Sequence, residues 1–473
     1  MKKILIHSLA GLVSVIGIGA FVFWLTKDPT GDLTASMPGE DQREAGSLMQ
    51  EIILIGEKFN LFGHQAAEMK GTWPRFRGAA FDNIVSEKQA LKDSWNSGEP
   101  EVLWTVELGE GHAGPAIYKG YVYLLDYDEE NREDALRCFS FADGKEVWRR
   151  SYEVRVKRNH GMSRTVPAVT EDYVVTIGPR CQVMCVDRLS GDFKWGLDLV
   201  KDYGATVPQW YTAQCPLIDG DKVILAPGGS AIMIAVDIHT GKVLWESPND
   251  MQWKMSHSSI MPMQLNGQNM YVYSAEGGVC GIAADGDDEG TALWQSNAWN
   301  HSVVAPSPVV FDDGRIFLTA GYGAGGMMIK VSEEAKRFKV DVLAEYLPRD
   351  GLASEQQTPV VWNGHLFGIL PKDGGSNRNQ LVCVHPDQVQ EMVWTSGKTT
   401  RFGLGPFLIA DGKMYILSDD GTLTMIKPDT KQYIELAQKK IFDGHDAWAP
   451  LAVADGRLLL RDSKTMFCLD ISK

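Results

Sequence analysis

The chain has 473 residues, of which 44% are apolar, and a formal net charge of −15 at pH 7. This length is sufficient for a large buried core. The acidic balance, which no Lys- or Arg-rich run offsets, argues against nucleic acid or an anionic membrane surface as a partner.

The first segment is an apolar run from Ile4 to Leu25, which follows Met1-Lys2-Lys3. It is long enough to span a bilayer and longer than the usual apolar region of a signal peptide. Because no clear A-x-A site follows, we expect residues 1–26 to be an uncleaved transmembrane anchor, with a cleaved signal peptide as the alternative. In both cases the lysine pair stays cytoplasmic and the remainder lies on the periplasmic, extracytoplasmic side of the cell membrane.

Residues 27–99 are expected to connect this anchor to the main domain. Thr26 to Ala45 is rich in Gly, Pro, Ser, Thr and acidic residues, which is typical of a flexible tether. Ser47 with Gln50 forms a capping box ahead of a short amphipathic helix. The apolar residues on the face of that helix are Leu48, Ile52, Ile55, Phe59 and Phe62.

The stretch from Ala235 to Trp245, A-V-D-I-H-T-G-K-V-L-W, predicts a β-hairpin that recurs along the chain. In its tight turn, Gly241 supplies a left-handed backbone conformation that other residues resist. Cys138 to Trp148 and Cys185 to Trp195 match it at the same spacing, and Cys383 to Trp394 matches with one inserted residue. The tryptophans that end these strands are Trp104, Trp148, Trp195, Trp245, Trp294 and Trp394.

A series of prolines gives the number of repeats independently. Each proline opens a short apolar strand, and a hairpin turn such as Asn-Gly or Asp-Gly follows a few residues later. The prolines are Pro115, Pro167, Pro216, Pro262, Pro308, Pro359, Pro406 and Pro450. Since proline donates no hydrogen bond to a sheet, each belongs on the inner edge strand of a blade, beside the central channel. Eight repeats of about 47 residues predict an all-β, eight-bladed β-propeller over residues 100–473.

One strand remains outside these repeats. Val102 to Glu107, which carries Trp104, precedes the first complete repeat, and the last repeat reaches Lys473 without an outer strand. We therefore expect Val102 to Glu107 to supply the missing strand and close the ring.

The seven cysteines are predicted to be free, buried thiols. Cys138, Cys185, Cys383 and Cys468 occupy the position in their repeats that Ala235 fills in the third, so they stand at a small apolar packing position in separate blades. No C-x-x-C-H and no paired C-x-x-C is present.

Trp73 to Gly78, W-P-R-F-R-G, precedes these repeats, and the combination resembles the bacterial PQQ-binding-like β-propeller repeat proteins. The resemblance covers Trp73 to the C-terminus and implies a ring similar to that of outer-membrane-protein assembly factor B. It also implies that the tryptophan at the strand end docks between neighbouring blades. Phe338 to Tyr346 in repeat 5 and Lys431 to Phe442 in repeat 7 lack the indole, so those two junctions must pack differently.

The loops between blades are expected to converge at the mouth of the channel, where propeller ligands usually bind. The residues just before each proline are polar or aromatic and include five of the ten histidines. They predict a funnel for a small planar or anionic molecule; alternatively, they only satisfy loop backbone groups at a solvent-filled channel. The candidate residues are His112, His160, Arg164, Trp210, Tyr211, His257, His301, Gln356, Arg401, His445, Asp446 and Trp448.

Motifs for metal binding and catalysis are weak or missing. Asp285 to Glu289 has the opening of a calcium loop, but Ser296 stands where the closing glutamate belongs, so we expect a solvated acidic turn and no metal site. The chain contains no H-E-x-x-H, no G-x-S-x-G and no P-loop.

The leading hypothesis is an exported, membrane-tethered propeller that binds a protein or a small ligand and catalyses nothing. The alternative is a periplasmic quinoprotein oxidoreductase that uses PQQ and calcium at the funnel. This follows from the resemblance, because quinoprotein alcohol dehydrogenases share the repeat, although this chain lacks their adjacent Cys-Cys pair. The candidate bases, expected to titrate near neutral pH, are His160, His257, His301 and His445. A third hypothesis, a carbohydrate-handling propeller, rests on Trp210, Tyr211 and Trp448.

Overall fold

The computed structural model describes residues 15–24, 26, 53–85, 88–96, 98–335 and 337–473. The chain divides into two compact units, Met1–Ile52 and Ile53–Lys473. In the first unit, residues 15–24 are helical. No helix within the described ranges is long and apolar enough to cross a membrane. Most of the expected anchor, and all of the expected tether except Thr26, lie outside the described residues.

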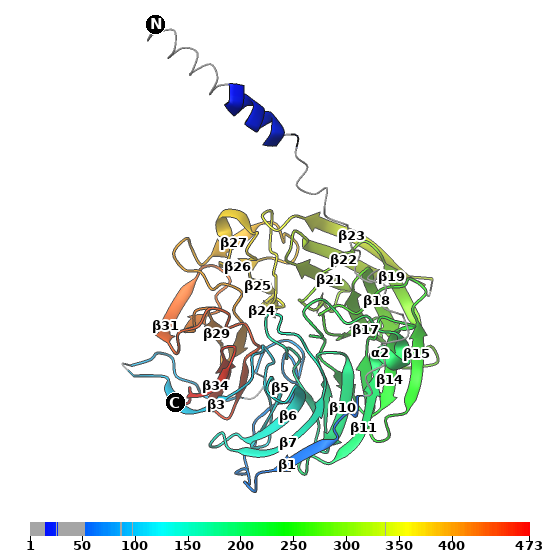
Figure 1. Ribbon diagram of the computed structural model, residues 1–473, viewed down its shortest axis with the longest axis vertical. Coiled ribbons are helices and arrows are strands. Elements are labelled where there is room, and N and C mark those ends of the chain that lie inside the picture. Colours follow the sequence, from blue (N-terminus) through cyan, green and yellow to red (C-terminus); the bar gives the residue numbers. More distant parts are fainter. Residues whose placement is uncertain (1–14, 25, 27–52, 86–87, 97, 336) are drawn as a thin grey trace. The chain divides into compact units, whose positions relative to one another are not determined.

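The second unit is a ring of eight antiparallel sheets, which confirms the predicted eight-bladed propeller (Figure 1). The strands of blades 1 to 4, from the inner edge outward, are β4 (Ala116–Tyr118), β5 (Tyr121–Asp128), β6 (Glu133–Ser140) and β7 (Glu146–Glu153); β8 (Ala168–Val169), β9 (Tyr173–Ile177), β10 (Gln182–Asp187) and β11 (Phe193–Asp198); β12 (Leu217–Asp219), β13 (Lys222–Leu225), β14 (Ala231–Asp237) and β15 (Val243–Pro248); β16 (Met261–Leu265), β17 (Gln268–Ala275), β18 (Gly278–Ala283) and β19 (Ala292–Ser296).

Blades 5 to 8 follow the same order. Their strands are β20 (Val309–Val310), β21 (Arg315–Ala320), β22 (Gly325–Glu334) and β23 (Arg337–Tyr346); β24 (Val360–Trp362), β25 (His365–Ile369), β26 (Leu381–Val384) and β27 (Met392–Thr395); β28 (Phe407–Ala410), β29 (Lys413–Leu417), β30 (Thr422–Lys427) and β31 (Ile434–Lys440); β32 (Ala452–Ala454), β33 (Arg457–Arg461), β34 (Thr465–Asp470) and β3 (Glu101–Glu107). Two short helical turns, α2 (Leu199–Tyr203) and η1 (Gly375–Asn377), lie between strands.

The ring closes as predicted, because β3 forms the outer strand of blade 8. It pairs antiparallel with β34, and Trp104 lies opposite Cys468. The repeat prolines stand at or just before the inner strands, as in blade 1, where Pro115 precedes β4. All seven cysteines are buried and unpaired, as expected. Burial raises the pKa of the Cys185 thiol to about 12, which keeps it protonated at neutral pH.

A large residue and a small one face each other on the outer pair of strands in every blade. In six blades an indole is the large partner, and a β-bulge interrupts the strand pairing at the same point. These pairs are Trp148 with Cys138, Trp195 with Cys185, Trp245 with Ala235, Trp294 with Gly281, Trp394 with Cys383 and Trp104 with Cys468. The small partner is needed for space, since a Cβ on Gly281 would lie 2.2 Å from Nε1 of Trp294.

The two blades without an indole reverse this arrangement. In blade 5 the inner partner is Met328 and the outer partner is Ala344, and in blade 7 they are Met425 and Ala437. Both methionines are buried. The unbranched methionine side chain fills from the inner strand the volume that the indole fills from the outer strand elsewhere. This reversal explains how the two exceptional blades remain packed.

The strand-end tryptophans dock against the next blade, as the resemblance implied. Indoles of four blades lie over a left-handed turn glycine of the following blade, where a Cβ would clash with the ring. These contacts join Trp104 to Gly144, Trp148 to Gly191, Trp195 to Gly241 and Trp245 to Gly290. The indole N–H groups of Trp104, Trp195 and Trp394 also donate to main-chain carbonyls of the next blade, those of Phe141, Ile238 and Asp429.

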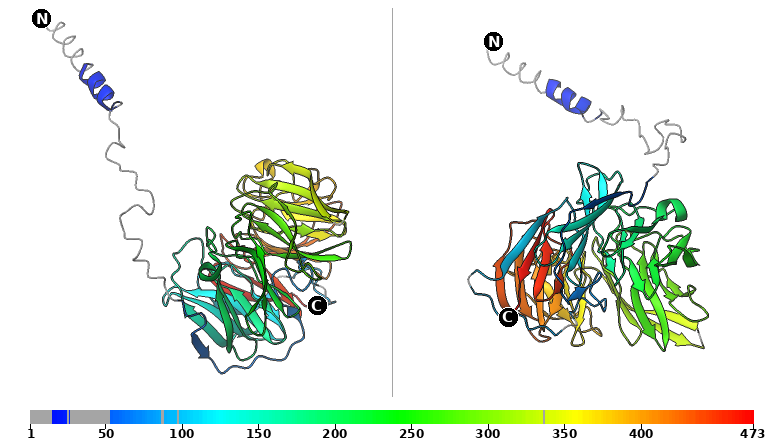
Figure 2. Two further views of the ribbon diagram at one scale, coloured as in Figure 1. Left: turned by 90° about the vertical axis from the view of Figure 1, so that its right-hand side faces the viewer. Right: turned by 90° about the horizontal axis from the view of Figure 1, so that it is seen from below.

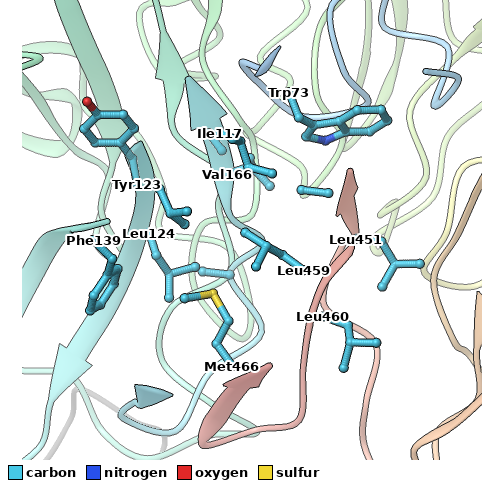
Figure 3. Close-up of a cluster of buried hydrophobic side chains, with 14 of the residues drawn as sticks. Trp73, Ile117, Tyr123, Leu124, Phe139, Val166, Leu451, Leu459, Leu460 and Met466 are labelled. Atoms are coloured by element: carbon cyan, nitrogen blue, oxygen red, sulfur yellow. The ribbon is translucent and has the colours of Figure 1, made fainter. Parts of the chain in front are cut away.

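The segment that begins with W-P-R-F-R-G crosses the centre of the ring. β2 (Thr72–Trp73) pairs with the inner strand β4, and Trp73 packs in a buried cluster with Ile117 (Figure 3). Further along, Arg75 donates to Ile218 O in blade 3 (3.0 Å). Asn83 then contacts Phe407 in blade 7. Because these strands line opposite sides of the channel, the segment over residues 71–85, here called the lead-in, fills it.

Arg77 is the central attachment of the lead-in. Its buried guanidinium donates to Phe81 O (2.8 Å) within the segment and to Thr358 O (3.1 Å) and Pro359 O (3.3 Å) in blade 6. The three carbonyl groups would lack a donor without it, since little water reaches this position. Arg77 therefore ties the lead-in to the ring.

The predicted amphipathic helix is wrong in its described part. Ile53 to Phe62 contains β1 (Lys58–Leu61), which pairs with the outer edge of blade 1 through β7 (Figures 1 and 2). Gly56 adopts a φ of 70°, which ends any helix, and β7 offers unpaired backbone groups that an extended segment satisfies. Phe59 then lies under the Arg150 guanidinium at 4.4 Å. Residues 47–52 of that helix lie outside the described residues.

We predict that the methionine–alanine pair of blade 5 behaves as one packing unit. Met328→Cys should leave a cavity and Ala344→Trp should crowd the blade, so each alone should lower the free energy of unfolding by roughly 1–3 kcal/mol. Together they recreate the Cys383–Trp394 pair, and urea unfolding should show the double variant to be more stable than the sum of the single effects by about 0.5–3 kcal/mol. Strictly additive losses would contradict this account.

We also predict that Arg77 stabilises the ring through the lead-in. Arg77→Met should lower the free energy of unfolding by about 3 kcal/mol or more, because three buried carbonyls lose their donor. Arg77→Lys should recover only part of this, since an ammonium group lacks the planar fork. Lys88→Met, at an exposed position nearby in the sequence, is the control for urea unfolding. Equal stability of Arg77→Met and the control would refute the role.

Candidate functional site

The interblade loops converge on a cavity of about 270 Å³ at the mouth of the channel. Each of the eight loops contributes at least one lining residue, and Phe76 of the lead-in lines it as well. The volume lies just below the usual range for small-molecule sites. Because the lead-in fills the channel, the cavity is a cup and not a tunnel.

Eight of the twelve predicted funnel residues line this cavity. They are His112, His160, Arg164, Trp210, His257, Gln356, Asp446 and Trp448. They come from six of the eight loops, so closure of the ring brings together residues up to about 340 positions apart in the sequence. The remaining loops contribute smaller side chains such as Ala305 and Leu404.

The other four predicted residues lie outside the lining. The Tyr211 hydroxyl donates to Lys157 O at 2.7 Å. His301 packs edge-on against Trp299, with ring centroids 4.3 Å apart. Arg401 donates to carbonyl groups of neighbouring loop residues, including Ser376 O at 3.0 Å. His445 is 87% exposed.

Several lining residues were missing from the predicted set. Glu355 and Gln357 flank the predicted Gln356, whereas Tyr322 and Lys372 come from connections between the second and third strands of blades 5 and 6. In an antiparallel blade these connections lie on the same face as the interblade loops. The alternation of strands could therefore have pointed to them, but Phe76 reaches the cavity only through the path of the lead-in.

Aromatic rings form two groups around the cavity. Trp210 stacks with Tyr322 at 5.6 Å between ring centroids and lies 6.2 Å from His257. His112 lies against Trp448 at 4.2 Å. Trp210 and Tyr322 both have a left-handed backbone, with φ of 65° and 57°, which bulky residues adopt only when their surroundings hold them there.

Arg164 ties its own loop, between blades 1 and 2, to the loop between blades 2 and 3. Its Nε donates to Trp210 O (2.5 Å), and its Nη2 donates to the carbonyls of Asn159 (3.1 Å) and His160 (2.6 Å). The guanidinium also lies 5.9 Å from the Trp448 ring, so it joins the two aromatic groups. Its Nε and Nη2 donors are thus directed to the loop backbone.

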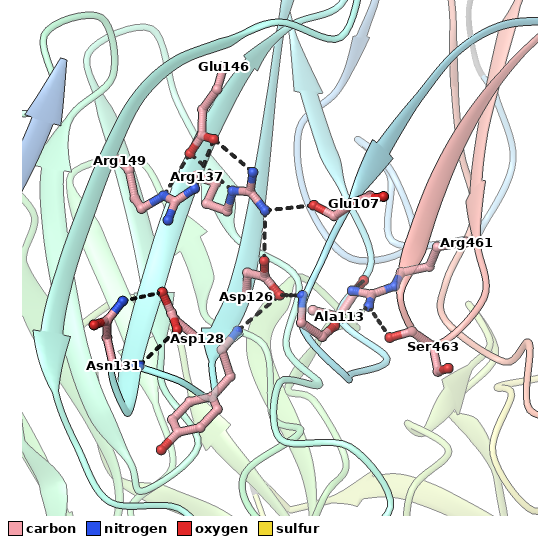
Figure 4. A network of polar contacts seen from close by, with 12 residues as sticks. Glu107, Ala113, Asp126, Asp128, Asn131, Arg137, Glu146, Arg149, Arg461 and Ser463 are labelled. Atoms are coloured by element: carbon pink, nitrogen blue, oxygen red, sulfur yellow. Dashed lines mark hydrogen bonds and ion pairs between the residues drawn. The ribbon is translucent and has the colours of Figure 1, made fainter. Parts of the chain in front are cut away.

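Arg461, at the end of β33 in blade 8, holds the loop that carries His112 and leads into blade 1. This buried guanidinium donates to Gly109 O (3.1 Å) and Ser463 O (2.8 Å) (Figure 4). In the same network, Asp126 accepts from Arg137 (2.9 Å) and from the Gly109 N–H (2.8 Å). Loop residues before β4 therefore have fixed backbone positions.

The two buried histidines of the cavity are neutral. His257 Nε2 donates to Gln209 O (2.5 Å), which leaves Nδ1 as an acceptor, and burial lowers the pKa of His257 to about 4. Burial also lowers the pKa of His112 well below its usual value, and its Nδ1 has no hydrogen-bond partner. The expectation that funnel histidines titrate near neutral pH is wrong for His257, because its burial was not visible in the sequence.

Glu355 lines the cavity, and a second buried carboxylate, Asp419, lies outside the lining. Glu355 is 7% exposed, and its Oε2 accepts from the Lys372 N–H at 3.3 Å. Burial raises the pKa of Glu355. Nearby, Asp419 accepts from the Leu404 N–H at 2.8 Å, and burial raises its pKa to about 6.

Metal-ligand clusters do not occur in the described part of the chain: no three His, Cys, Asp or Glu side chains come together there in a way that could hold an ion. In the loop from Asp285 to Glu289, Glu289 binds Lys222 (2.7 Å) and accepts from Trp245 Nε1 (3.0 Å). The loop lies within blade 4, between β18 and β19, and these two contacts attach it to blade 3.

The fold and cavity define an eight-bladed propeller of the quinoprotein-repeat type, with a cavity that is open at one mouth of the channel. The PQQ_2 family, described as outer membrane protein assembly factor BamB, matches residues 94–206 and 131–375. These matches span more than half of the chain, which therefore belongs to this family. No curated protein matches the chain by sequence.

Solved structures share the fold at low sequence identity. BamB from Moraxella catarrhalis is 12% identical with a TM-score of 0.51, and the match covers 78% of this chain and 99% of that one. A europium-containing methanol dehydrogenase is 12% identical with a TM-score of 0.55, covering 84% and 88%. The quinohemoprotein alcohol dehydrogenase from Comamonas testosteroni is 11% identical with a TM-score of 0.54, covering 86% and 82%. These similarities concern the fold alone.

We predict that His257 makes the fold acid-sensitive. Its pKa is about 4 in the folded protein and 6.5 without burial, so its contribution is complete above pH 6.5 and is lost as the pH falls toward 4. At pH 5 the loss in the free energy of unfolding, relative to neutral pH, should be about 2 kcal/mol. His257→Gln keeps a donor for Gln209 O and should remove that part of the pH dependence in urea unfolding. His445→Gln, at an exposed site, should leave it intact; identical profiles for all three proteins would contradict the assignment.

Proposed function

We propose that this protein is a binding module whose ligand, a small molecule or a group on a protein partner, occupies the cup formed by the interblade loops. The observation that carries this proposal is the convergence of all eight loops on one cavity that the lead-in closes from below. Membership of the BamB family supports a binding or scaffold role. The proposal includes no catalytic step.

The proposal also includes export and a membrane tether. It rests on the apolar run from Ile4 to Leu25 and on the similarity to an outer-membrane assembly factor. In this proposal residues 1–26 anchor the chain, residues 27–99 connect it and residues 100–473 bind the ligand on the periplasmic side. The connecting part from Ile53 onward is already packed with the ring.

The alternative function is a PQQ-dependent oxidoreductase. The fold shared with methanol and alcohol dehydrogenases favours it. Against it stands the neutral, buried state of His257, whose pKa is about 4. A proton acceptor matched to neutral pH would need a higher value.

Blocking the cup should abolish binding without unfolding the ring. We predict that native mass spectrometry of protein purified from its own host, or of its complex with a partner, shows a bound species that Ala305→Trp removes. Ala305 lines the cavity, and Ala292→Trp, on the exposed outer strand β19, is the matched control. A bound species that persists in Ala305→Trp would refute the proposed location.

Calorimetric titration of PQQ, with and without calcium, separates the two functions. We predict no calcium-dependent binding, because the described residues supply no cluster of ligands for the ion. Tight calcium-dependent binding that Ala305→Trp abolishes would favour the oxidoreductase instead.

A further inference from the structure

The charges that line the cup are unequally available to a ligand. Arg164 directs its Nε and Nη2 hydrogen bonds to backbone carbonyls of Trp210, Asn159, His160 and Gly161. These bonds hold its guanidinium against the loop backbone and the Trp448 ring. Two of its three nitrogens, Nε and Nη2, are therefore committed to the loop backbone, and an anion that needs them would have to break these bonds.

Glu355 has no comparable partner. Its carboxylate offers about four acceptor positions, yet one backbone N–H at 3.3 Å is the single hydrogen bond recorded for it within the described chain. Its side chain packs against Gly321, where a Cβ would lie 2.4 Å from Cγ of Glu355. A buried carboxylate is costly unless it is paired, so this group is suited to receive a cation.

The aromatic rings of the lining have the same preference. Trp210 and Tyr322 present stacked rings beside Glu355, and aromatic faces attract cations. His112 Nδ1 is buried without a hydrogen-bond partner. Lys372 also lines the cup; its side chain is exposed, forms no ion pair within the described residues, and carries a charge that opposes the rise in the pKa of Glu355.

We propose that the cup binds an organic cation, an alkylammonium or guanidinium group, between the carboxylate of Glu355 and the rings of Trp210 and Tyr322. This inference deepens the proposed function and rests on it, because it names the chemistry of the ligand in the same cavity. The source is either a free small molecule or a lysine or arginine side chain of a protein partner. The net charge of −15 also favours the approach of cations over anions.

The test uses calorimetry on the full chain with tetramethylammonium and butylammonium as probes. tert-Butanol is the neutral probe and citrate is the anionic probe. We expect both ammonium ions to bind and the other two not to bind. A capped Gly-Lys-Gly peptide distinguishes the two sources. Binding of the peptide as well as the ammonium ions, with the same dependence on Glu355, assigns the cation to a protein side chain. Binding of the ammonium ions without the peptide assigns it to a free small molecule.

Two variants at the cavity should change affinity in opposite directions. Glu355→Gln should weaken binding of the cation about 10-fold or more, because it removes the charge and keeps the shape. Lys372→Met should strengthen it about fivefold, because one repulsive charge leaves the lining. Glu129→Gln removes the same charge from an exposed loop and should have no effect.

The outcomes also separate this inference from the proposed function. Preference for citrate, weakened by Lys372→Met, would overturn the cation assignment. Absence of cation binding, while native mass spectrometry still detects a species that Ala305→Trp removes, would overturn it as well and leave the binding module standing. If Ala305→Trp displaces nothing and no cation or peptide binds, both proposals fail.

Discussion

The pairing of β3 with β34 joins the start of the propeller to its end, and the architecture of the site depends on it. Without this strand, blade 8 would expose its third strand, and the seam between blades 8 and 1 would lack the docked indole of Trp104. Closure also brings the His112 loop against the Trp448 loop, with ring centroids 4.2 Å apart. One wall of the cup is therefore a direct product of ring closure.

The lead-in supplies the second constraint. A ring of eight blades leaves a central channel, and here residues 71–85 fill it through backbone and Arg77 contacts with strands on opposite sides. This turns an open channel into a cup, with Phe76 among its lining residues. The polar groups that are unpartnered in the cup, such as His112 Nδ1, lie where a ligand and not bulk solvent would meet them.

The sequence predicted the parts of the fold that repeat. Proline, Asn-Gly turns and the indole recur with a fixed period, so blade number and ring closure followed from local patterns. Interblade docking followed from the family resemblance, and the structure confirms all three. The strand β1 was missed because Phe59 and its neighbours also fit a helical face, and only the free edge of β7 decides between the two. The Met328–Ala344 reversal was missed because it requires the register of two strands.

The site was predictable only where it follows the repeat. Eight of the twelve chosen residues line the cavity because each stands at a constant place in an interblade loop. His301 and Arg401 stand at similar places but turn to Trp299 and to loop carbonyls, which depends on local packing. Phe76 comes from a segment outside the repeats, whereas Tyr322 lies in a connection that the alternation of strands could have placed at the channel mouth. The pKa of His257 follows from burial by other blades, which no local pattern encodes.

The most direct measurement is a crystal structure of this protein with tetramethylarsonium, whose arsenic atom locates the cation by anomalous scattering. The account predicts one strong peak in the cup, between the Glu355 carboxylate and the rings of Trp210 and Tyr322. Peaks confined to exposed carboxylates outside the cup, with no peak beside Glu355, would contradict it.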